Sequence, residues 1–385
     1  MEVDKHINCL IDSGASISKD NLIKLRNYIL NNQKRNIELI LQELMEELSD
    51  YTFSFLKTGV IKGINTSICL DQIDLNIYGG NNINYDTEFD IASITKLFTL
   101  ILVFKFIDNG ILKAADRICD IDSRFSYLDY TIDDLIKMCG HIVTNERIDE
   151  ALSKEEALNR LYSVHPVHYN KKINNYTDIG FMVLSKVIEN ITMLPFDEVI
   201  KSFYRDYGIL INQKSQVVGN GHNDYLPHDP KARIMGGCIG SSGIFINSLN
   251  MKKMAYRIFD DNNFIACNHL LKLSQKLFDN NHANKGLAGI YIKHPLGIKK
   301  SSTPNEYSKY AFSHQGYTGS CIILDPYHRL YSGIMVDAIK DNQKKDSNFY
   351  KYFNIYHEKL VFITLKTYLI QECFYPRRIK IIQKI

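Results

Sequence analysis

The sequence predicts an α+β fold in which N- and C-terminal strands form one antiparallel sheet flanked by helices, next to a mostly helical lobe. Three observations predict it. Strand-like segments lie near both ends of the chain, at 59–80 and 319–339. Residues 130–205, between them, have mostly helical periodicity. Helical patterns also flank the strands, from residue 37 to 48 and at about 346–371.

The composition is that of an ordinary soluble globular protein. The 385 residues are 45% hydrophobic and 23% charged, and suffice for one large domain or two lobes. The net charge of +3 gives no reason to expect nucleic acid or a membrane surface as a partner. The longest apolar run, 97–104, is too short for stable membrane insertion.

The cysteines and the N-terminus predict a cytoplasmic protein. The eight cysteines are scattered without any Cys-x-x-Cys pair, which is typical of reduced thiols. The first residues contain no apolar core of signal-peptide length. Loss of a signal segment and non-standard export are the alternatives.

We expect residues 1–35 to form an extension, because polar residues interrupt the apolar stripe of their one helical pattern. A clearer helix follows from Ile37, and two strands then turn near Asp71-Gln72. Residues 36–385 are predicted to be a single catalytic domain. Its α/β lobe is expected at about 36–125 and 240–385, and its helical lobe at about 126–239.

The segment 93–108 predicts a helix that is apolar on nearly every side and ends at Asn109-Gly110. Such a helix should lie buried in the middle of the protein. A Gly-rich stretch at 236–245 predicts a tight loop that shapes a cleft wall. Asp325-Pro326 opens the turn of the C-terminal hairpin.

A Ser-x-x-Lys pattern occurs three times, beginning at Ser16, Ser54 and Ser93. Ser93 fits a nucleophile best, because it follows an extended segment and opens a helix. The unpaired N–H groups of a first helical turn can hold an oxyanion, and Lys96 lies one turn further on. Ser16 lies in the extension, and the Ser54 pattern overlaps Lys-Thr-Gly at 57–59, which cannot then form a separate cleft wall.

Lys96 is one of two charged residues between Ile91 and Ile107, the other being Lys105. A lysine inside so apolar a helix is costly unless it has partners or a purpose. As a base it must lose its proton, which desolvation and a nearby cation would favour. The alternative is that Lys96 extends to solvent at the edge of the helix.

The segment "FDIASITK" (89–96) resembles the nucleophile segment of the β-lactamase/penicillin-binding-protein superfamily of serine hydrolases. The branch of class C-like esterases, D-aminopeptidases and DD-peptidases is the most similar. Tyr176-Thr177-Asp178 resembles its Tyr-x-Asn element, and His314-Gln315-Gly316 its Lys-Thr-Gly or His-x-Gly element. "TIDDLIKMCG" and "HDPKARIMGGCIGSSGIF" also resemble family segments, in family order, so the likeness covers about 37–370.

The resemblance implies that Ser93 attacks a carbonyl group to form an acyl-enzyme. Lys96 and Tyr176 would share the proton, which Tyr176 passes to the leaving group. The backbone N–H groups of Ser93 and Tyr317 would form the oxyanion hole. No metal and no cofactor is implied.

His314 would be the fourth catalytic residue and would orient the network together with Asp178, and Asp178 and Gly316 would be supporting residues. By residue type alone, Tyr176 could be a helix anchor, His314 a strand-end histidine and Asp178 a helix N-cap. Asp178 stands where many members have Asn, and its charge would stabilise protonated Lys96. His314 replaces a lysine that binds the substrate carboxylate in stricter β-lactamases, which argues against efficient β-lactam turnover.

The expected function is hydrolysis of a small ester, amide or D-amino-acid-containing peptide. Acyl or peptidyl transfer, or a catalytically silent binding protein on the same fold, are the alternatives. Other chemistries have little support, since there is no Gly-x-Ser-x-Gly elbow and "HPVH" (165–168) has the wrong spacing for a zinc helix. The basic tail 377–385 is expected to be solvated, and the oligomeric state is open.

Overall fold

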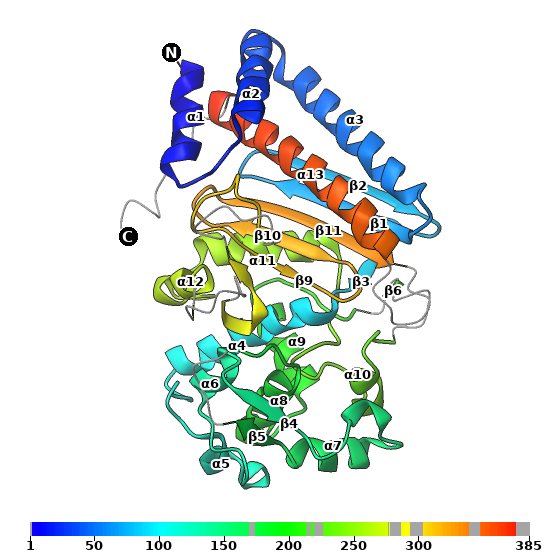
Figure 1. Ribbon diagram of the computed structural model, residues 1–385, viewed down its shortest axis with the longest axis vertical. Coiled ribbons are helices and arrows are strands. Elements are labelled where there is room, and N and C mark those ends of the chain that lie inside the picture. The colour runs from blue at the N-terminus through cyan, green and yellow to red at the C-terminus, as the bar shows by residue number, and fades with distance from the viewer. Residues whose placement is uncertain are drawn as a thin grey trace.

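The computed structural model has the α+β architecture that the sequence predicts (Figure 1). One lobe holds a large sheet with helices on both faces, and the other lobe is mostly helical. The basic tail lies outside the described residues. The structure describes residues 2–168, 174–213, 217–218, 226–275, 277, 286–292, 303–338 and 347–374.

The main sheet joins strands from both ends of the chain. Its strands are β1 (Ile61–Cys69), β2 (Asp74–Gly80), β8 (Tyr291–Ile292), β9 (Phe312–Gln315), β10 (Cys321–Asp325) and β11 (Leu330–Ala338). They lie in the order β2-β1-β11-β10-β9-β8, and each neighbouring pair is antiparallel. In the central pair, Ile64 lies opposite Val336. The shared antiparallel sheet is therefore confirmed.

Two predicted turns are also present. β1 and β2 are joined through residues 70–73, and β10 and β11 through residues 326–329. In the second turn the Asp325 carboxylate accepts the N–H groups of Tyr327 at 3.1 Å and His328 at 3.3 Å. An aspartate that bonds to the following backbone in this way favours a tight turn.

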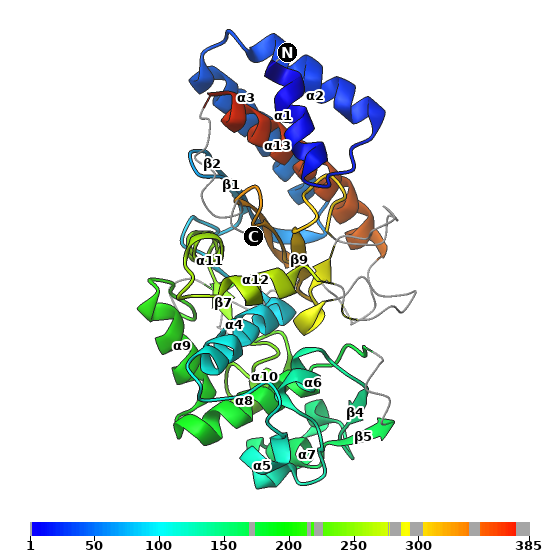
Figure 2. The same ribbon diagram turned by 90° about the vertical axis from the view of Figure 1, so that its left-hand side faces the viewer.

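Four helices lie on one side of the sheet; the last two named below pack directly on its strands, and the first two pack against the C-terminal helix (Figure 2). They are α1 (Glu2–Asp12), α2 (Lys19–Asn32), α3 (Ile37–Leu56) and α13 (Ser347–Phe374). Ser18 and Asn36 cap α2 and α3 by accepting backbone N–H groups. Leu10 and Leu25 are buried in the same hydrophobic core as α13. The first 35 residues therefore share a core with the rest of this lobe.

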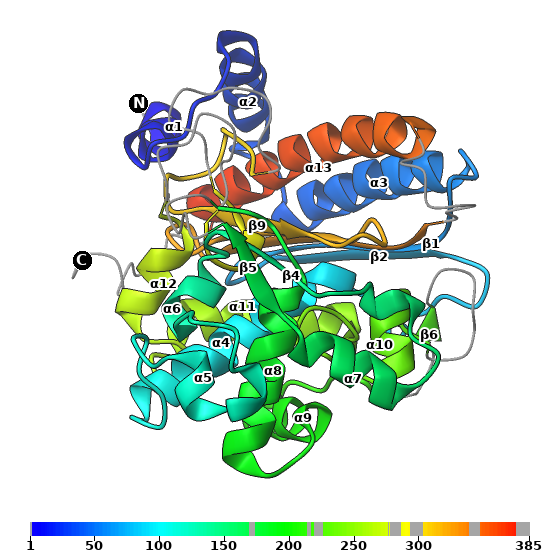
Figure 3. The same cartoon turned by 60° about the horizontal axis from the view of Figure 1, so that its bottom comes forward.

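The other face is covered by α4 (Thr95–Asp108), with α11 (Ser248–Asp260) and α12 (Cys267–Leu273) close by (Figure 3). Every residue of α4 from Thr95 to Phe104 is buried, as its apolar sequence predicts. Because helices pack on both faces, all nine residues of β11 are buried as well. The site described below lies at the N-terminal end of α4.

The helical lobe packs below α4 (Figures 1 and 3). Tyr204 ties the two together by donating a hydrogen bond to the Phe98 carbonyl at 2.8 Å. The "HPVH" segment is a strand that pairs antiparallel with residues 141–143. The elements of the lobe are α5 (Ile118–Ile121), α6 (Ile132–Ile136), β4 (His141–Val143), α7 (Lys154–Tyr162), β5 (His165–His168), α8 (Ile179–Thr192), α9 (Phe196–Asp206) and α10 (Pro230–Met235).

A small sheet fixes the position of the segment that leads into α4. β3 (Glu88–Asp90) lies between β6 (Val217–Val218) and β7 (Phe245–Ile246). The Ile91 N–H then donates to the Ile244 carbonyl at 3.1 Å, and a short 3₁₀ turn, η1 (Ala92–Ile94), leads directly into α4. This sheet fixes where residue 93 lies.

Among the described residues, no single helix has the length and apolar composition needed to cross a membrane, although α8 and α9, bent by 82°, meet that test as a pair. All eight cysteines are free thiols.

Candidate active site

Ser93 and Lys96 face each other at the start of α4. The Lys96 ammonium donates to Ser93 Oγ at 3.0 Å and to the Ser241 carbonyl at 3.2 Å. The Lys96 side chain has no exposed surface, whereas Ser93 is partly exposed. Lys96 therefore does not extend to solvent. Ala92, just before the serine, has a φ of 44°, a strained backbone conformation of the kind found at functional sites.

Two residues from the segment before α8 complete the surroundings of Lys96. Asp178 Oδ1 lies 2.7 Å from the Lys96 nitrogen, which is also 5.0 Å from the centre of the Tyr176 ring. Asp178 occupies the N-cap position of α8, but its side chain makes no capping bond. It contacts the lysine instead, so the carboxylate serves the site and not the helix end.

The charge state of the pair follows from its geometry. Burial alone would lower the pKa of Lys96, but the Asp178 carboxylate and the Tyr176 hydroxyl outweigh burial and raise it above its ordinary value. Burial opposes the ionised form of Asp178 too, yet Lys96 and Lys231 lower its pKa to about 2. At neutral pH the site therefore holds an ammonium–carboxylate pair, and Lys96 has not lost its proton.

The end of β9 forms the wall opposite Lys96. Gly316 lies so close to the chain before Ser93 that a Cβ atom there would be 2.4 Å from the Ile91 carbonyl oxygen. The Thr318 hydroxyl donates to the Asp90 carbonyl at 2.8 Å. Because the residues on both sides of Tyr317 contact the 90–91 backbone, the Tyr317 peptide lies beside η1, where an oxyanion donor is needed.

His314 lies in β9 but connects to a different part of the site. Its side chain is buried, with Nε2 3.1 Å from the Ala288 carbonyl and Nδ1 3.1 Å from the Gln315 carbonyl. Ala288 belongs to the 3₁₀ turn η4 (Leu287–Gly289). Gly289, its last residue, packs against the Tyr176 ring. His314 therefore reaches Tyr176 through η4 and offers its ring to backbone carbonyls.

Gly289→Ala is expected to slow any reaction that uses Tyr176 by about tenfold or more, within the range for a displaced general acid–base group. A Cβ atom at residue 289 would lie 2.3 Å from Tyr176 Cε2, and the φ of +75° adds strain for any side chain. The rate of acylation measures the effect. Ala288→Gly, in the same turn at a φ of 56°, is the matched control and should act like wild type. Equal rates for both variants would contradict the packing argument.

Asp90 is a buried carboxyl group three residues before Ser93. Its Oδ1 accepts the Ala92 N–H at 2.8 Å and its Oδ2 the His228 N–H at 2.6 Å. Burial raises the pKa of Asp90 to about 6, against the opposing effect of these two bonds. The group holds the backbone turn that leads to Ser93.

The stability that Asp90 contributes should depend on pH. Its folded-state pKa lies above the unfolded value of about 3.9, so its contribution is fully present below pH 4 and is lost as the pH rises through about 6. The free energy of unfolding of wild type relative to Asp90→Asn should therefore fall by up to about 3 kcal/mol between pH 4 and 7. Denaturant titrations of both proteins measure it, and a pH-independent difference would contradict the assignment.

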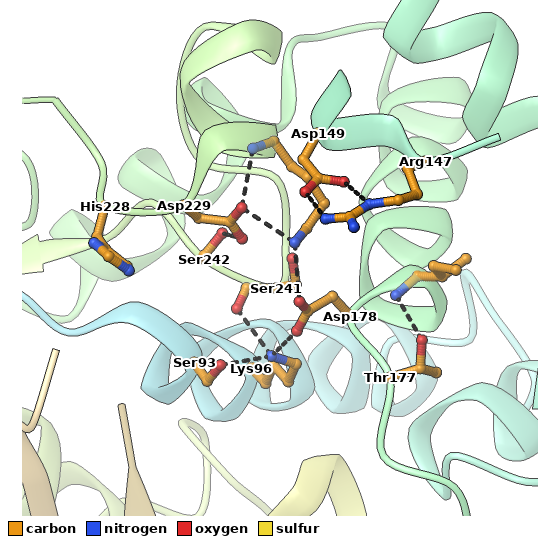
Figure 4. A network of polar contacts seen from close by, with 12 residues as sticks. Ser93, Lys96, Arg147, Asp149, Thr177, Asp178, His228, Asp229, Ser241 and Ser242 are labelled. Atoms are coloured by element: carbon orange, nitrogen blue, oxygen red, sulfur yellow. Dashed lines mark hydrogen bonds and ion pairs between the residues drawn. The ribbon is translucent and has the colours of Figure 1, made fainter. Parts of the chain in front are cut away.

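Sequence reasoning missed a charged chain that continues from Asp178 into α10 (Figure 4). Lys231 Nζ lies 3.2 Å from Asp178 Oδ2 and 3.2 Å from Asp229 Oδ1. Ser242 donates to Asp229 Oδ2 at 2.7 Å. Lys231 and Asp229 lie in "HDPKARIMGG", but nothing local in that segment indicates that it meets Asp178.

His228 was also missed. Its ring stacks on Tyr317, with centroids 4.8 Å apart and planes 17° from parallel. Both rings are partly exposed, and they border the wall formed by β9.

Comparisons with known proteins concern the fold of the chain. Residues 73–205 match the family model described as Beta-lactamase. No curated protein matches the sequence. Many solved structures share the fold.

Three of these structures illustrate the likeness. "EstCE1, a hydrolase with promiscuous acyltransferase activity" is 12% identical, with a TM-score of 0.65 over 83% of this chain and 99% of that one. A class C β-lactamase mutant is 12% identical, with a TM-score of 0.64 over 83% and 97%. A crystal structure of SurE with D-Leu is 14% identical, with a TM-score of 0.62 over 83% and 75%. The chain thus has the fold of the β-lactamase/penicillin-binding-protein superfamily of serine hydrolases, as the resemblance noted in its sequence implies.

Proposed function

We propose that the protein is a serine hydrolase that works through an acyl-enzyme on Ser93. One observation carries the proposal: a partly exposed serine hydroxyl lies 3.0 Å from a fully buried lysine ammonium, in a site that also holds Tyr176. Burying an ammonium group costs free energy. Its position beside a serine hydroxyl supports a role for Lys96 in activating that hydroxyl as a nucleophile.

The proton of Ser93 leaves through the Lys96–Tyr176 pair. Lys96 is protonated at neutral pH, so it acts first as a cation that stabilises negative charge on a neighbouring oxygen. Tyr176, 37% exposed and adjacent to Lys96, is placed to accept the Ser93 proton on its oxygen while its own hydroxyl proton passes to the leaving group. Ser93 Oγ bonds to the carbonyl carbon, and the leaving group departs with that proton.

The N–H groups of Ser93 and Tyr317 hold the carbonyl oxygen while it carries negative charge. Water then attacks the acyl-enzyme, releasing the acid and restoring the serine. The substrates are small esters, amides or D-amino-acid-containing peptides. His314 is buried against two carbonyl groups, so it does not replace the missing lysine as a fixed, accessible cation for a substrate carboxylate.

Intact-protein mass after exposure to a fluorophosphonate tests the proposal, with p-nitrophenyl acetate and a penicillin as separate reagents. We expect a single fluorophosphonate adduct that is absent from Ser93→Ala. Ser54→Ala, in another Ser-x-x-Lys pattern and exposed on α3, is the matched control and should be labelled like wild type. A folded wild-type protein that no reagent modifies would favour a catalytically silent binding protein.

A second candidate is acyl or peptidyl transfer, since the structurally similar EstCE1 is described as a hydrolase with acyltransferase activity. The same acyl-enzyme serves both reactions, and the accepted nucleophile separates them. Adding an amine to the ester assay should yield an amide product if transfer occurs, whereas exclusive release of the acid supports hydrolysis.

A further inference from the structure

One carboxylate in the site is bound by two ammonium groups. Asp178 Oδ1 lies 2.7 Å from Lys96 and Asp178 Oδ2 lies 3.2 Å from Lys231 (Figure 4). Lys231 in turn binds Asp229 Oδ1 at 3.2 Å. The four side chains alternate in charge and sum to zero.

The position of Lys231 is fixed by the start of α10. Asp229 is the N-cap of this helix and accepts the backbone N–H of Lys231 at 2.9 Å, and Pro230 occupies the first turn. The Lys231 side chain is 20% exposed and that of Asp229 13%. Water screens such poorly exposed charges less than it screens surface ion pairs. The electric fields of Lys231 and Asp229 therefore affect the neighbouring charged groups more strongly.

Charged and titratable groups face this chain from every element packed against it. Asp149, which pairs with Arg147 at 2.6 Å, lies near enough to Lys231 for each to influence the other. Asp90 lies near enough to Asp229 to be influenced by it. Other such groups are Arg233 on α10, which influences Asp90, Tyr176 before α8, and His314 on β9, which contacts the turn behind Tyr176.

The consequence for Lys96 follows from simple electrostatics. With Asp178 as its only partner, the full negative charge of the carboxylate would act on Lys96 and hold its proton. A second ammonium on the other oxygen attracts the same negative charge and repels the proton on Lys96. Lys231 therefore makes proton movement in the Lys96–Tyr176 pair easier than Asp178 alone would permit.

We propose that Lys231 is a positioning residue of this active site: it holds the second oxygen of Asp178 and shares the carboxylate with Lys96, which tunes the proton acceptor for Ser93. This inference rests on the proposed function, because it concerns the proton that Ser93 gives up. It also explains how an aspartate is tolerated where many members of the superfamily have an asparagine.

The test is the pH profile of Ser93 acylation, measured as the rate of fluorophosphonate labelling by intact mass between pH 6 and 10. In Lys231→Met the rising part of the profile should move to higher pH by about one unit, which is about tenfold slower labelling at a fixed pH on that limb. Lys231→Arg keeps the cation and should restore the wild-type profile. Asp178→Asn should move the profile the opposite way, since Lys231 then acts on Lys96 without a carboxylate between them.

Lys201→Met is the matched control, because Lys201 pairs with Asp197 on α9, outside the network around Lys96. Its profile should equal that of wild type. Lys231→Gln is the second variant, to be used if the methionine variant does not fold. Profiles that superimpose for wild type and a folded Lys231→Met or Lys231→Gln would overturn the inference, whereas a wild-type protein without any Ser93 adduct would overturn the proposed function itself.

Discussion

Lys96→Met is expected to slow the acylation of Ser93 about a thousandfold, the middle of the range for losing a positioned proton-transfer group. The substitution removes the Lys96 side-chain donor to Ser93 Oγ and the cation that stabilises negative charge there. Methionine fills most of the same apolar space, so the change acts mainly on charge. The rate of fluorophosphonate labelling measures the result.

Stability is the necessary control for this variant. Removing one partner of a buried ion pair leaves the other uncompensated and can cost about 3–5 kcal/mol. Here Asp178 is 31% exposed and keeps Lys231, so the loss should be smaller. Lys105→Met, on the same helix but bonded to the Asn263 carbonyl, should label at the wild-type rate. A folded Lys96→Met that labels like wild type would remove Lys96 from the mechanism.

Gly316→Ala is expected to reduce acylation at least about a hundredfold, the cost of losing one oxyanion donor. The new methyl group would sit 2.4 Å from the Ile91 carbonyl oxygen, a distance that no Cβ atom tolerates. The end of β9 must then move away from η1, and the Tyr317 peptide moves with it. Labelling rates combined with thermal unfolding separate this local displacement from general destabilisation.

Gly180→Ala is the matched control for that substitution. Gly180 lies in the first turn of α8, where a Cβ atom would meet nothing nearer than 3.6 Å. Alanine favours a helix over glycine by about 0.5–1 kcal/mol, so this variant should be as stable as wild type or more so. Full activity in Gly316→Ala would show that the 316–318 backbone is not part of the reaction centre.

The large elements could be predicted because their signals are local. The apolar run of α4, the helix starting at Ile37 and the Asp325 turn each depend on spacing and residue type within a short window. The small sheet around β3 could not be predicted in this way. β6 and β7 have two residues each, and they are strands only because distant segments come together beside β3.

The site residues also differ in whether a local pattern could predict them. Ser93 and Lys96 are three residues apart on one helical turn, so their pattern alone places them together. Tyr176 and Asp178 needed the resemblance to known enzymes, because nothing local indicates that they meet α4. The part played by Lys231 depends on a contact between α10 and the start of α8, and neither the pattern nor the resemblance supplies it.

The pairing of β1 with β11 affects folding during synthesis as well as the stability of the folded protein. β1 cannot pair with β11 until β11 has been synthesised, and β11 lies about 270 residues further along the chain. During synthesis the N-terminal segment therefore emerges with an open strand edge, and such long-range pairing folds slowly. β9, whose C-terminal end lies beside η1, is also among the last strands to be translated. The segment that holds Ser93 is thus synthesised long before the strand that completes its surroundings, so the site can form only after most of the chain has been made.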